Sequence, residues 1–392
     1  MRILILGGDG YLGWPTAMHF SAEGHQVTVA DNFAKRKWEL EQGIAPLLPI
    51  PPLHDRVHTW NVTNKSNMQM RIGDLKNARF TYGLLDEVKP DAIVHYGEQP
   101  SATYSMQSRA AAVDTQVNNV VGTLNILFAM QHACPESHLV KLGTMGEYGT
   151  PNIDIEEGYL TVTHNGRTDT VLYPKKPASF YHLSKVHDSH NIAFACRTWG
   201  VRATDLNQGV VYGMNTAQTE KNDKFRTSFH YDHVFGTVIN RFLVQASIGE
   251  PLTVYGRGGQ TRGFLDIRDT VQCVDLAVNT PADEGEFRIF NQFTEQYSVL
   301  QLAERVRQAG KRAGLSVDIS HVENPRAEAE EHYYNAKHSK LADLGLKANL
   351  LTDESIDQML ATVLKHTDSV DRRNLLPTIR WKGGGTRPRT ES

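Results

Sequence analysis

Short apolar runs alternate with longer helical stretches over the first half of the chain. Each run has the length and character of a buried strand, and polar or glycine-bearing residues follow it, as expected where a loop begins. The predicted strands cover residues 3–6, 27–30, 70–72, 92–95, 139–143 and 202–206. Strands that alternate with helices form parallel sheets covered on both faces. The pattern therefore predicts an α/β fold with a doubly wound parallel sheet.

An insertion, residues 32–67, separates the second predicted strand from the third. It contains Pro46, Pro49, Pro51 and Pro52. Because proline cannot continue a helix, we expect a long ordered loop here. Such a loop could cover a ligand or only decorate the surface, and the sequence favours neither.

The second half of the chain is less regular. Helices are predicted over 235–246, 299–313 and 355–365, and an extended segment over 252–255. We expect a cofactor-binding domain, residues 1–205, and a smaller mixed α/β substrate domain, residues 206–380, with some segments that cross back. Residues 381–392 have too little apolar content to pack and are predicted to be a mobile tail. The polar segment 215–230 is a mobile flap or an ordinary loop, and the sequence slightly favours the flap.

Composition excludes several classes of partner. The 41 Lys and Arg residues against 44 Asp and Glu residues give a net charge of −3, so no strongly positive field favours nucleic acid. No apolar run approaches the roughly 18 residues that span a bilayer, so no membrane insertion is expected. A strand beginning beside Met1 leaves no room for a targeting peptide and predicts a cytoplasmic protein. Cys134, Cys196 and Cys273 lie far apart and are expected to be reduced core thiols, with no metal site.

A glycine-rich turn follows the first predicted strand and leads into a helical run. Its G-x-x-G-x-x-G spacing permits a tight turn and a close approach of the backbone to a pyrophosphate, which the helix N-terminus attracts. The turn consists of Gly7, Gly8, Asp9, Gly10, Tyr11, Leu12 and Gly13. Together with the alternating strands, this motif predicts a Rossmann-type sheet that binds a dinucleotide.

The end of the second predicted strand indicates which dinucleotide. Asp31 lies eighteen residues past Gly13, where a carboxylate accepts hydrogen bonds from ribose hydroxyls and repels the extra phosphate of NADP. NAD is therefore predicted, with Asn32 beside it. Lys35, Arg36 and Lys37 follow closely and leave NADP open; the first two are also cofactor-contact candidates.

Asp74 and Leu75 follow the third predicted strand and are placed to meet the adenine. Asp74 could equally be only a helix cap.

Tyr181 and Lys185 are separated by one helical turn, so they share one face of a helix. The ammonium and a positive nicotinamide ring would lower the pKa of the phenol, which could then take a hydroxyl proton as hydride leaves the attached carbon. Thr144, at the end of the fifth predicted strand, is placed to polarise the same oxygen.

These motifs resemble the extended short-chain dehydrogenase/reductase family that modifies nucleotide sugars, over nearly the whole chain. Residues 141–159, 163–170 and 179–191 are most similar to its UDP-sulfoquinovose synthase branch. The resemblance implies that Thr144, Tyr181 and Lys185 form the catalytic set and that Thr144 and Tyr181 also contact substrate. It places Asn118 and Asn207 at the substrate, and Gln208 and Val211 beside the nicotinamide.

The resemblance also implies the reaction. The substrate would be UDP-glucose, and sulfite, possibly delivered by a donor protein, would supply a sulfonate at carbon 6. Oxidation at carbon 4 acidifies carbon 5, water is lost across carbons 5 and 6, sulfite adds, and carbon 4 is reduced again. NAD would be regenerated in each cycle and held tightly. Helices over 115–131 and 181–199 would pair two subunits into a homodimer.

The sequence departs from related sugar dehydratases, which carry Asp-Glu directly after the catalytic threonine. Met145 and Gly146 stand there instead. We expect Glu147, His182 or both to move protons at carbons 5 and 6. Alternatively, Glu147 is an acceptor behind the site and His182 points elsewhere from its helix.

Arginines suit the diphosphate of a nucleotide sugar. Arg262 and Arg326 match positions that bind it in related UDP-sugar epimerases, and residues 253–256 resemble the strand lining the uracil, which implicates Thr253 and Tyr255. Arg268 is a weaker candidate, since it could pair structurally with Asp269.

Pro100 stands where the family carries an arginine that contacts substrate. Gln99 and Ser101 are therefore predicted to hold the sugar.

Two other functions stay open at this level. A UDP-glucose 4-epimerase or a 4,6-dehydratase would share the fold, NAD, the Tyr–Lys pair and the uridine site. A dinucleotide-binding sensor or scaffold would share the fold alone. The intact Thr144, Tyr181 and Lys185 argue against the sensor.

Overall fold

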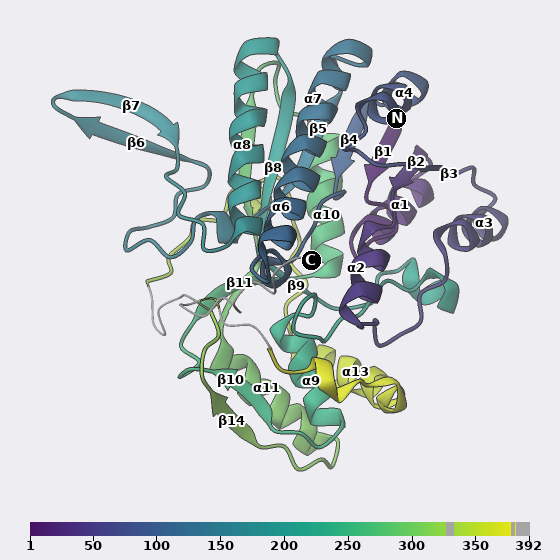
Figure 1. Ribbon diagram of the computed structural model, residues 1–392, viewed down its shortest axis with the longest axis vertical. Coiled ribbons are helices and arrows are strands. Elements are labelled where there is room, and N and C mark those ends of the chain that lie inside the picture. The colour runs from purple at the N-terminus through teal and green to yellow at the C-terminus, as the bar shows by residue number, and fades with distance from the viewer. Residues whose placement is uncertain (327–332, 378–380, 382–392) are drawn as a thin grey trace, which may run out of the picture.

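A seven-stranded parallel sheet forms the upper part of the molecule (Figure 1). The computed structural model describes residues 1–326, 333–377 and 381. The sheet order is β12-β8-β5-β4-β1-β2-β3, so the direction of winding reverses between β1 and β4. Its strands are β1 (Arg2–Leu6), β2 (Gln26–Asp31), β3 (Gln69–Ile72), β4 (Ala92–His95), β5 (His138–Thr144), β8 (Arg202–Gln208) and β12 (Phe287–Gln292). All six strands predicted from the sequence are confirmed, and ligands of such sheets bind at the point of reversal.

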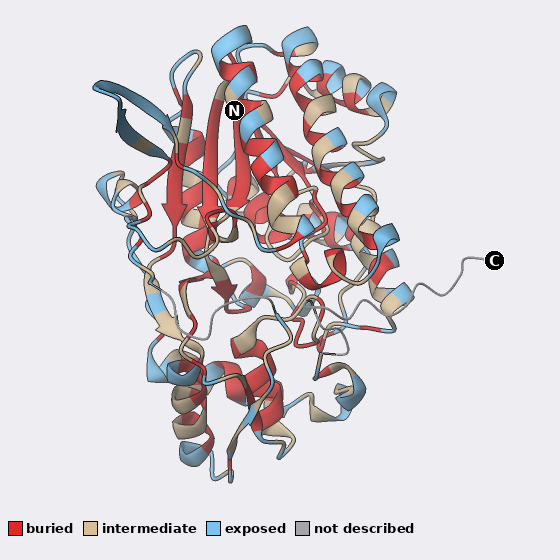
Figure 2. Cartoon of the chain, turned by 60° about the vertical axis from the view of Figure 1, so that its left-hand side comes forward, coloured by how far each residue is buried: buried red, intermediate tan, exposed pale blue. Residues whose placement is uncertain are grey.

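Helices cover both faces of the sheet because side chains alternate along each strand. Ile3 and Ile5 pack with α1 (Gly13–Ala22), α3 (Leu53–Asn64) and α10 (Ile267–Asn279). Leu4 and Leu6 point the other way, into the core under three further helices. Those helices are α4 (Ala78–Val88), α7 (Gly122–Ala133) and α8 (Phe180–Trp199). Strands β1, β4, β5, β8 and β12 are mostly buried between these layers, whereas the edge strand β3 has no buried residue (Figure 2).

The insertion is mostly helical, so the prediction of a long loop over 32–67 is wrong. It forms α2 (Ala34–Gln42) and α3, and all four prolines lie between Gln42 and Leu53. Proline excludes a helix only at and just before its own position, so the segments on either side can be helical. Trp38 and Trp60 of these segments are buried in the protein.

The smaller lower part contains two short sheets and three longer helices. One sheet has the order β13-β11-β9, and the other pairs β10 with β14. The strands are β9 (Val210–Tyr212), β10 (Leu252–Tyr255), β11 (Thr261–Asp266), β13 (Glu295–Ser298) and β14 (Ile319–Val322). The helices are α9 (Val238–Ser247), α11 (Val299–Arg312) and α13 (Asp353–Leu364). The predicted elements 252–255, 299–313 and 355–365 are confirmed within two residues, and the helix predicted from 235 begins at Val238. Between β11 and β13 the chain returns to the large sheet through α10 and β12.

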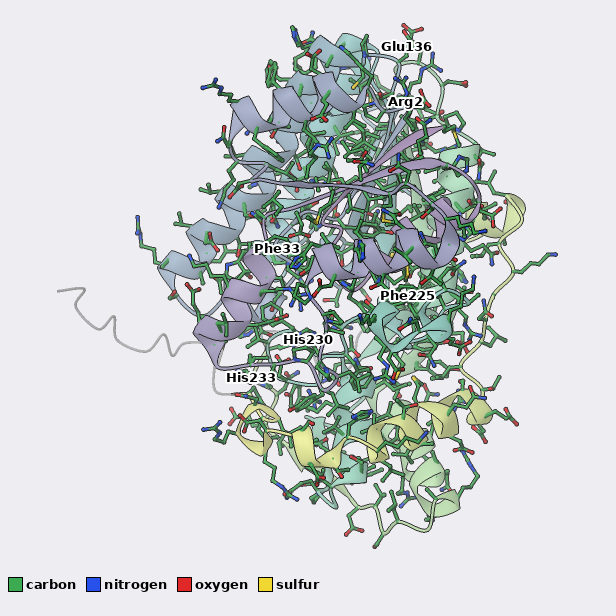
Figure 3. The ribbon with its side chains drawn as sticks, turned by 90° about the vertical axis from the view of Figure 1, so that its right-hand side faces the viewer. Arg2, Phe33, Glu136, Phe225, His230 and His233 are labelled. Carbon is green, nitrogen blue, oxygen red and sulfur yellow. The ribbon has the colours of Figure 1, made fainter. Side chains whose placement is uncertain are left out.

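Residues 215–230 form a packed segment with two short 3₁₀ helices, Thr219–Lys221 and Asp223–Phe225. The indole of Trp14 donates a hydrogen bond to the Phe225 carbonyl at 3.0 Å, and Thr227 donates to the carbonyl of Tyr11 at 2.5 Å. Phe225 and His230, labelled in Figure 3, are both buried. The structure therefore favours an ordered connection over a flap.

The described chain also contains three short α-helices, a hairpin and, near its end, the 3₁₀ helices Thr367–Ser369 and Arg372–Asn374. The α-helices are α5 (Ala102–Ser105), α6 (Arg109–Gln116) and α12 (Lys340–Asp343). Strands β6 (Tyr159–His164) and β7 (Arg167–Leu172) form the hairpin, which projects from the body beside α8 (Figure 1). Of the predicted tail, residues 382–392 lie outside the described part. The three cysteines are buried and unbridged, and no described helix has the length and apolar character needed to cross a bilayer.

Candidate active site

The glycine-rich turn has the geometry that a dinucleotide requires. Gly7 has a φ of 85°, and a β carbon there would lie 2.7 Å from the backbone of Tyr96. A β carbon on Gly13 would lie 2.1 Å from the carbonyl oxygen of Gly7. No side chain caps the start of α1 at Leu12, and the N–H of Trp14 donates to the carbonyl of Gly10 at 3.3 Å. The positive end of the helix dipole therefore lies at the glycine-rich turn, where it favours an anion.

Asp31 lies at the end of β2 and lines the cavity beside this turn. Its oxygens accept hydrogen bonds from the backbone N–H of Asp9 at 2.9 Å and of Phe33 at 2.7 Å. Burial raises its pKa to about 6. Each oxygen keeps a lone pair for a ribose hydroxyl, so the residues present fit NAD.

The cations after Asp31 are already paired with carboxylates. Arg36 donates to Asp9 through two nitrogens, at 2.6 and 3.1 Å, and Lys35 lies 2.6 Å from Glu39. The exposed Lys37 lies 3.5 Å from Glu41. This pairing weakens the case for NADP, because its ribose phosphate would have to displace these partners.

Asp9 also ties the insertion to the turn. The fully buried Arg56 of α3 donates to the Asp9 carboxylate at 2.5 Å and to its carbonyl at 3.1 Å. Both helices of the insertion therefore hold one side chain of the glycine-rich turn.

A second, smaller cavity adjoins the turn, and Asp74, Leu75 and Asn32 line it. Asp74 also accepts a hydrogen bond from the N–H of Lys76 at 2.8 Å. Asp74 thus lies where an adenine would fit and stabilises a turn at the same time.

The main cavity has a volume of about 680 Å³ and lies at the point where the sheet reverses. It joins the glycine-rich turn to the predicted catalytic pair. Its lining includes Asp31, Glu98, Pro100, Asn118, Tyr181, Lys185 and Gln208. Residues 45–47, 49 and 50 of the insertion also line it, which favours the covering role over surface decoration.

Tyr181 and Lys185 stand near the start of α8, whose N-cap is Ser179. The Lys185 ammonium donates to the carbonyl of Leu142 at 2.7 Å and lies 5.9 Å from the centre of the Tyr181 ring. Burial raises the pKa of Tyr181, and Lys185 only partly opposes this. The expectation that Lys185 lowers this pKa is confirmed in direction, but burial outweighs it.

Thr144 ends β5 and caps the 3₁₀ turn Met145–Glu147. Its Oγ accepts a hydrogen bond from the N–H of Gly146 at 3.1 Å, and the Glu147 carboxylate accepts one from the N–H of Thr144 at 3.2 Å. This reciprocal capping fixes the Thr144 hydroxyl at the strand end.

Glu147 is fully buried and does not line the cavity. Its carboxylate accepts hydrogen bonds from Lys175, from Ser189 at 3.0 Å and from Lys141 at 3.3 Å. The two ammonium groups hold its pKa well below the usual range. A carboxylate that is this strongly ionised and enclosed suits the alternative, an acceptor that orients Thr144, better than proton transfer.

His182 lies against the 3₁₀ turn Met145–Glu147. Its Nδ1 lies 3.0 Å from the Ser179 hydroxyl, and its ring centre lies 5.2 Å from that of Tyr181. A β carbon on Gly146 would lie 2.3 Å from its Nε2. The imidazole thus packs against the turn that follows Thr144, although His182, like Glu147, is not among the residues that line the main cavity.

The structure does not direct Gln99 and Ser101 into the cavity. Both are buried; Ser101 donates to the carbonyl of Val234 at 2.5 Å and accepts from the N–H of Tyr104, while Gln99 accepts from the N–H of Ser101 at 3.0 Å. The Ser101 hydroxyl is used by local backbone groups, which speaks against its contact with the sugar. The Nε2 of Gln99 has no hydrogen-bond partner within the described chain, so the prediction for Gln99 stays a prediction.

Of the residues implied by the resemblance, Asn118 and Gln208 line the cavity. Asn118 lies in a π-helical turn, Val117–Val121, a feature frequent at functional sites. Val211 is buried beside Tyr11 and Leu12. Asn207 is buried beneath the catalytic strand and donates to the Tyr148 hydroxyl at 2.9 Å, so only its position near the site agrees with the prediction.

The predicted nucleotide end lies in the smaller part of the molecule. Thr253 and Tyr255 lie on β10, which pairs with β14, and Arg326 follows β14 and lies 5.5 Å from the ring of Trp381. Arg262 lies on β11. Arg268 donates to the Asp266 carboxylate at 2.8 and 2.9 Å. It therefore makes a structural pair, as the alternative proposed, but with Asp266 instead of Asp269.

Sequence reasoning missed two buried charged residues. Arg241 on α9 donates to the Tyr255 hydroxyl at 3.0 Å and to the Thr253 carbonyl at 3.1 Å. Glu98, which follows β4, lies 2.6 Å from the Lys185 ammonium. The only sequence signal for Glu98 was a carboxylate shortly after an apolar predicted strand. No sequence motif indicated Arg241.

Comparisons with known proteins agree with this site. A model of the NAD dependent epimerase/dehydratase family matches residues 3–291. The chain belongs to this family. It is 56% identical, over 99% of its length and 81% of the relative's, to a protein of Spinacia oleracea named UDP-sulfoquinovose synthase, chloroplastic. A UDP-sulfoquinovose synthase of Sulfolobus acidocaldarius is 42% identical over 97% of this chain and 98% of the relative.

Solved structures with this fold include the UDP-glucose 4-epimerase of Thermotoga maritima with UDP-glucose, with a TM-score of 0.69 at 18% identity. The alignment covers 93% of this chain and 99% of the epimerase. The UDP-glucuronic acid 4-epimerase of Bacillus cereus, with UDP-glucuronic acid and NAD, gives a TM-score of 0.68 at 19% identity and the same coverage. Both confirm the Rossmann-type α/β fold.

Proposed function

We propose that this chain converts UDP-glucose and sulfite to UDP-sulfoquinovose, with NAD as a tightly held cofactor. The observation that carries the proposal is the packing of His182 against Gly146, directly beside the Thr144, Tyr181 and Lys185 set. Dehydratases place an acidic side chain after the threonine, whereas here an imidazole takes that space. The similarity to two UDP-sulfoquinovose synthases supports the same conclusion.

The first step needs a base at the carbon 4 hydroxyl. Tyr181 takes that proton, the Thr144 hydroxyl hydrogen-bonds the same oxygen, and the Lys185 ammonium stabilises the phenolate that forms. Bound NAD supplies the oxidation of carbon 4 and its later reduction. Asp31 and the glycine-rich turn orient the cofactor.

The elimination needs one proton removed and one delivered. The ketone at carbon 4 acidifies the hydrogen on carbon 5, and His182 takes that proton and gives it to the carbon 6 hydroxyl, which leaves as water. Sulfite, entering as hydrogen sulfite, then forms the carbon–sulfur bond at carbon 6, and the proton that it carries goes to carbon 5. Ser179, which contacts Nδ1, leaves Nε2 of His182 as the nitrogen facing the turn.

The smaller part of the molecule would hold the uridine diphosphate. Arg262 and Arg326 supply charge for the phosphates, and Tyr255, which Arg241 holds in place, supplies an aromatic platform for the base.

The subunits would pair through the helices next to the catalytic residues. Val113, Val117 and Val121 repeat every four residues along α6 and the π-helical turn and are 45%, 42% and 37% exposed. Phe128 of α7 and Phe194 of α8 are also exposed, and α6, the π-helical turn and α7 form one continuous helical run that lies beside α8 (Figure 1). An apolar stripe of this kind favours a homodimer built on these helices.

Mass spectrometry of nucleotide sugars, after incubation of the protein with UDP-glucose with and without sulfite, tests the proposal. A sulfonated sugar formed only with sulfite is expected. UDP-galactose or a dehydrated sugar in both reactions would assign the chain to the epimerases or dehydratases instead.

A further inference from the structure

A buried carboxylate pairs with the catalytic lysine. Glu98 Oε2 lies 2.6 Å from the Lys185 ammonium, and both residues line the main cavity together with Tyr181. The Glu98 side chain is 2% exposed, so little water screens this ion pair. The other face of Glu98 contacts His95, whose Nε2 lies 3.5 Å from Oε1.

His95 does not compete for the charge of Glu98. Burial lowers its pKa to about 4, so the imidazole is neutral near pH 7. Lys185 is then the cation in contact with Glu98 within the described chain. The lysine in turn is held from two sides, by Glu98 and by the carbonyl of Leu142 at 2.7 Å.

Asp188, one turn further along α8, is the other carboxylate packed in this region. Burial raises its pKa well above the usual range. It resembles Glu98 in burial and in its position near Lys185, but the ion pair with the lysine is made by Glu98.

We propose that Glu98 is a positioning residue that anchors the Lys185 ammonium and offsets part of its field, so that Tyr181 keeps its proton until the positive nicotinamide ring is bound. The inference deepens the proposed function, because it assigns the control of the base in the first step.

The charges around Tyr181 support this role. Lys185 favours the phenolate, whereas Glu98, in contact with that lysine, opposes it. A lysine paired with a carboxylate at 2.6 Å acts on the tyrosine nearly as a dipole rather than as a full charge. Other charged or titratable groups near the phenol are Glu147, Lys141 and the neighbouring His182.

The test measures ionisation of Tyr181 without substrate, so it does not depend on which sugar is converted. Ultraviolet difference spectra between each protein and the same protein carrying Tyr181→Phe report the phenolate, over the pH range in which circular dichroism shows a folded chain. Glu98→Gln keeps the shape of the side chain and a hydrogen bond to Lys185 but removes the charge. Asp188→Asn is the matched control, because it changes an equally buried carboxyl on the same helix as Lys185 while the ion pair between Glu98 and Lys185 stays in place.

We expect Glu98→Gln to shift the ionisation of Tyr181 to lower pH by about one unit, and Asp188→Asn to leave it unchanged. The acid limb of UDP-glucose-dependent cofactor reduction should shift in the same direction. The proposal would be overturned if Glu98→Gln and the unmodified protein titrated at the same pH in both measurements.

If Glu98→Gln does not fold, Glu98→Asp serves instead. Its shorter side chain lengthens the ion pair, and a smaller shift in the same direction is expected. An unchanged titration would again overturn the proposal.

Discussion

The side chain of His182 occupies the space that any side chain at position 146 would need. A β carbon on Gly146 would lie 2.3 Å from Nε2 of His182, closer than non-bonded atoms approach. Gly146 follows the capping residue Thr144 by two positions, so the glycine leaves room for an imidazole beside the 3₁₀ turn Met145–Glu147. The two residues pack together, although 36 positions separate them in the chain.

Replacement of His182 by Ala is expected to lower formation of the sulfonated product by about 10²- to 10⁴-fold, because the proton shuttle is lost. NAD should stay bound, since His182 does not line the cavity around the glycine-rich turn. His187→Ala, on the exposed side of the same helix, is the control. Unchanged turnover of His182→Ala would remove the imidazole from the mechanism.

Gly146→Ala should have a similar effect by displacing the imidazole. The double variant with His182→Ala should lose no more activity than His182→Ala alone, because both changes remove the same group. Additive losses, measured by the same product assay, would show that the two residues act separately.

Glu147→Gln is expected to destabilise the protein by about 3–5 kcal/mol, because it leaves the buried Lys141 and Lys175 with one fewer counter-charge. Denaturant unfolding measures the free energy. Glu156→Gln, which removes a partly exposed pair with Lys337, should cost no more than about 1 kcal/mol. Equal effects of the two changes would contradict the role assigned to the buried network.

The affinity for NAD is expected to fall as the pH drops through about 6, the pKa of Asp31 in the protein. Ribose hydroxyls bind the ionised carboxylate, so below this pH binding must expel a proton and weakens by about tenfold per unit. Calorimetric titration of nucleotide-free protein between pH 5 and 8 measures this, and Asp31→Asn should bind more weakly and show no such dependence. A flat profile for the unmodified protein would rule out the contact.

Val117→Asp is expected to convert the proposed dimer to a monomer, because it places a charge in the centre of the apolar stripe on α6 and the π-helical turn. Sedimentation velocity measures the mass in solution. Val62→Asp, at a 67% exposed position of α3, is the control and should not change it. A mass that Val117→Asp leaves unchanged would argue against this interface.

Local patterns were enough to predict the large sheet and its cofactor turn. The strand 3–6 is apolar at every position because both faces of the sheet are covered, and the glycines at 7 and 13 stand where no β carbon fits. The insertion was misjudged for a local reason as well. Its four prolines predicted a loop, whereas the segments on either side of them form two helices. Trp38 and Trp60 pack these helices against distant segments of the chain.

At the site, sequence spacing predicted the side chains that lie close together within a single helix or turn. Tyr181 and Lys185 share a face because four residues make one turn, and Asp31 follows from the length of the first β-α-β unit. The roles of Glu147 and Gln99 could not be read in this way, since both depend on which buried donors surround them. Glu98 is a further case, because its partner Lys185 is 87 residues away.

The sequence by itself determined the doubly wound sheet, the dinucleotide turn and the shared helix face of Tyr181 and Lys185, because periodicity and short motifs act within a few residues. Only the tertiary structure decided that the insertion lines the cavity, that His182 meets Gly146, and that Glu98 contacts Lys185. Burial sets the charge states of such groups, and burial arises only when elements distant in the chain pack together.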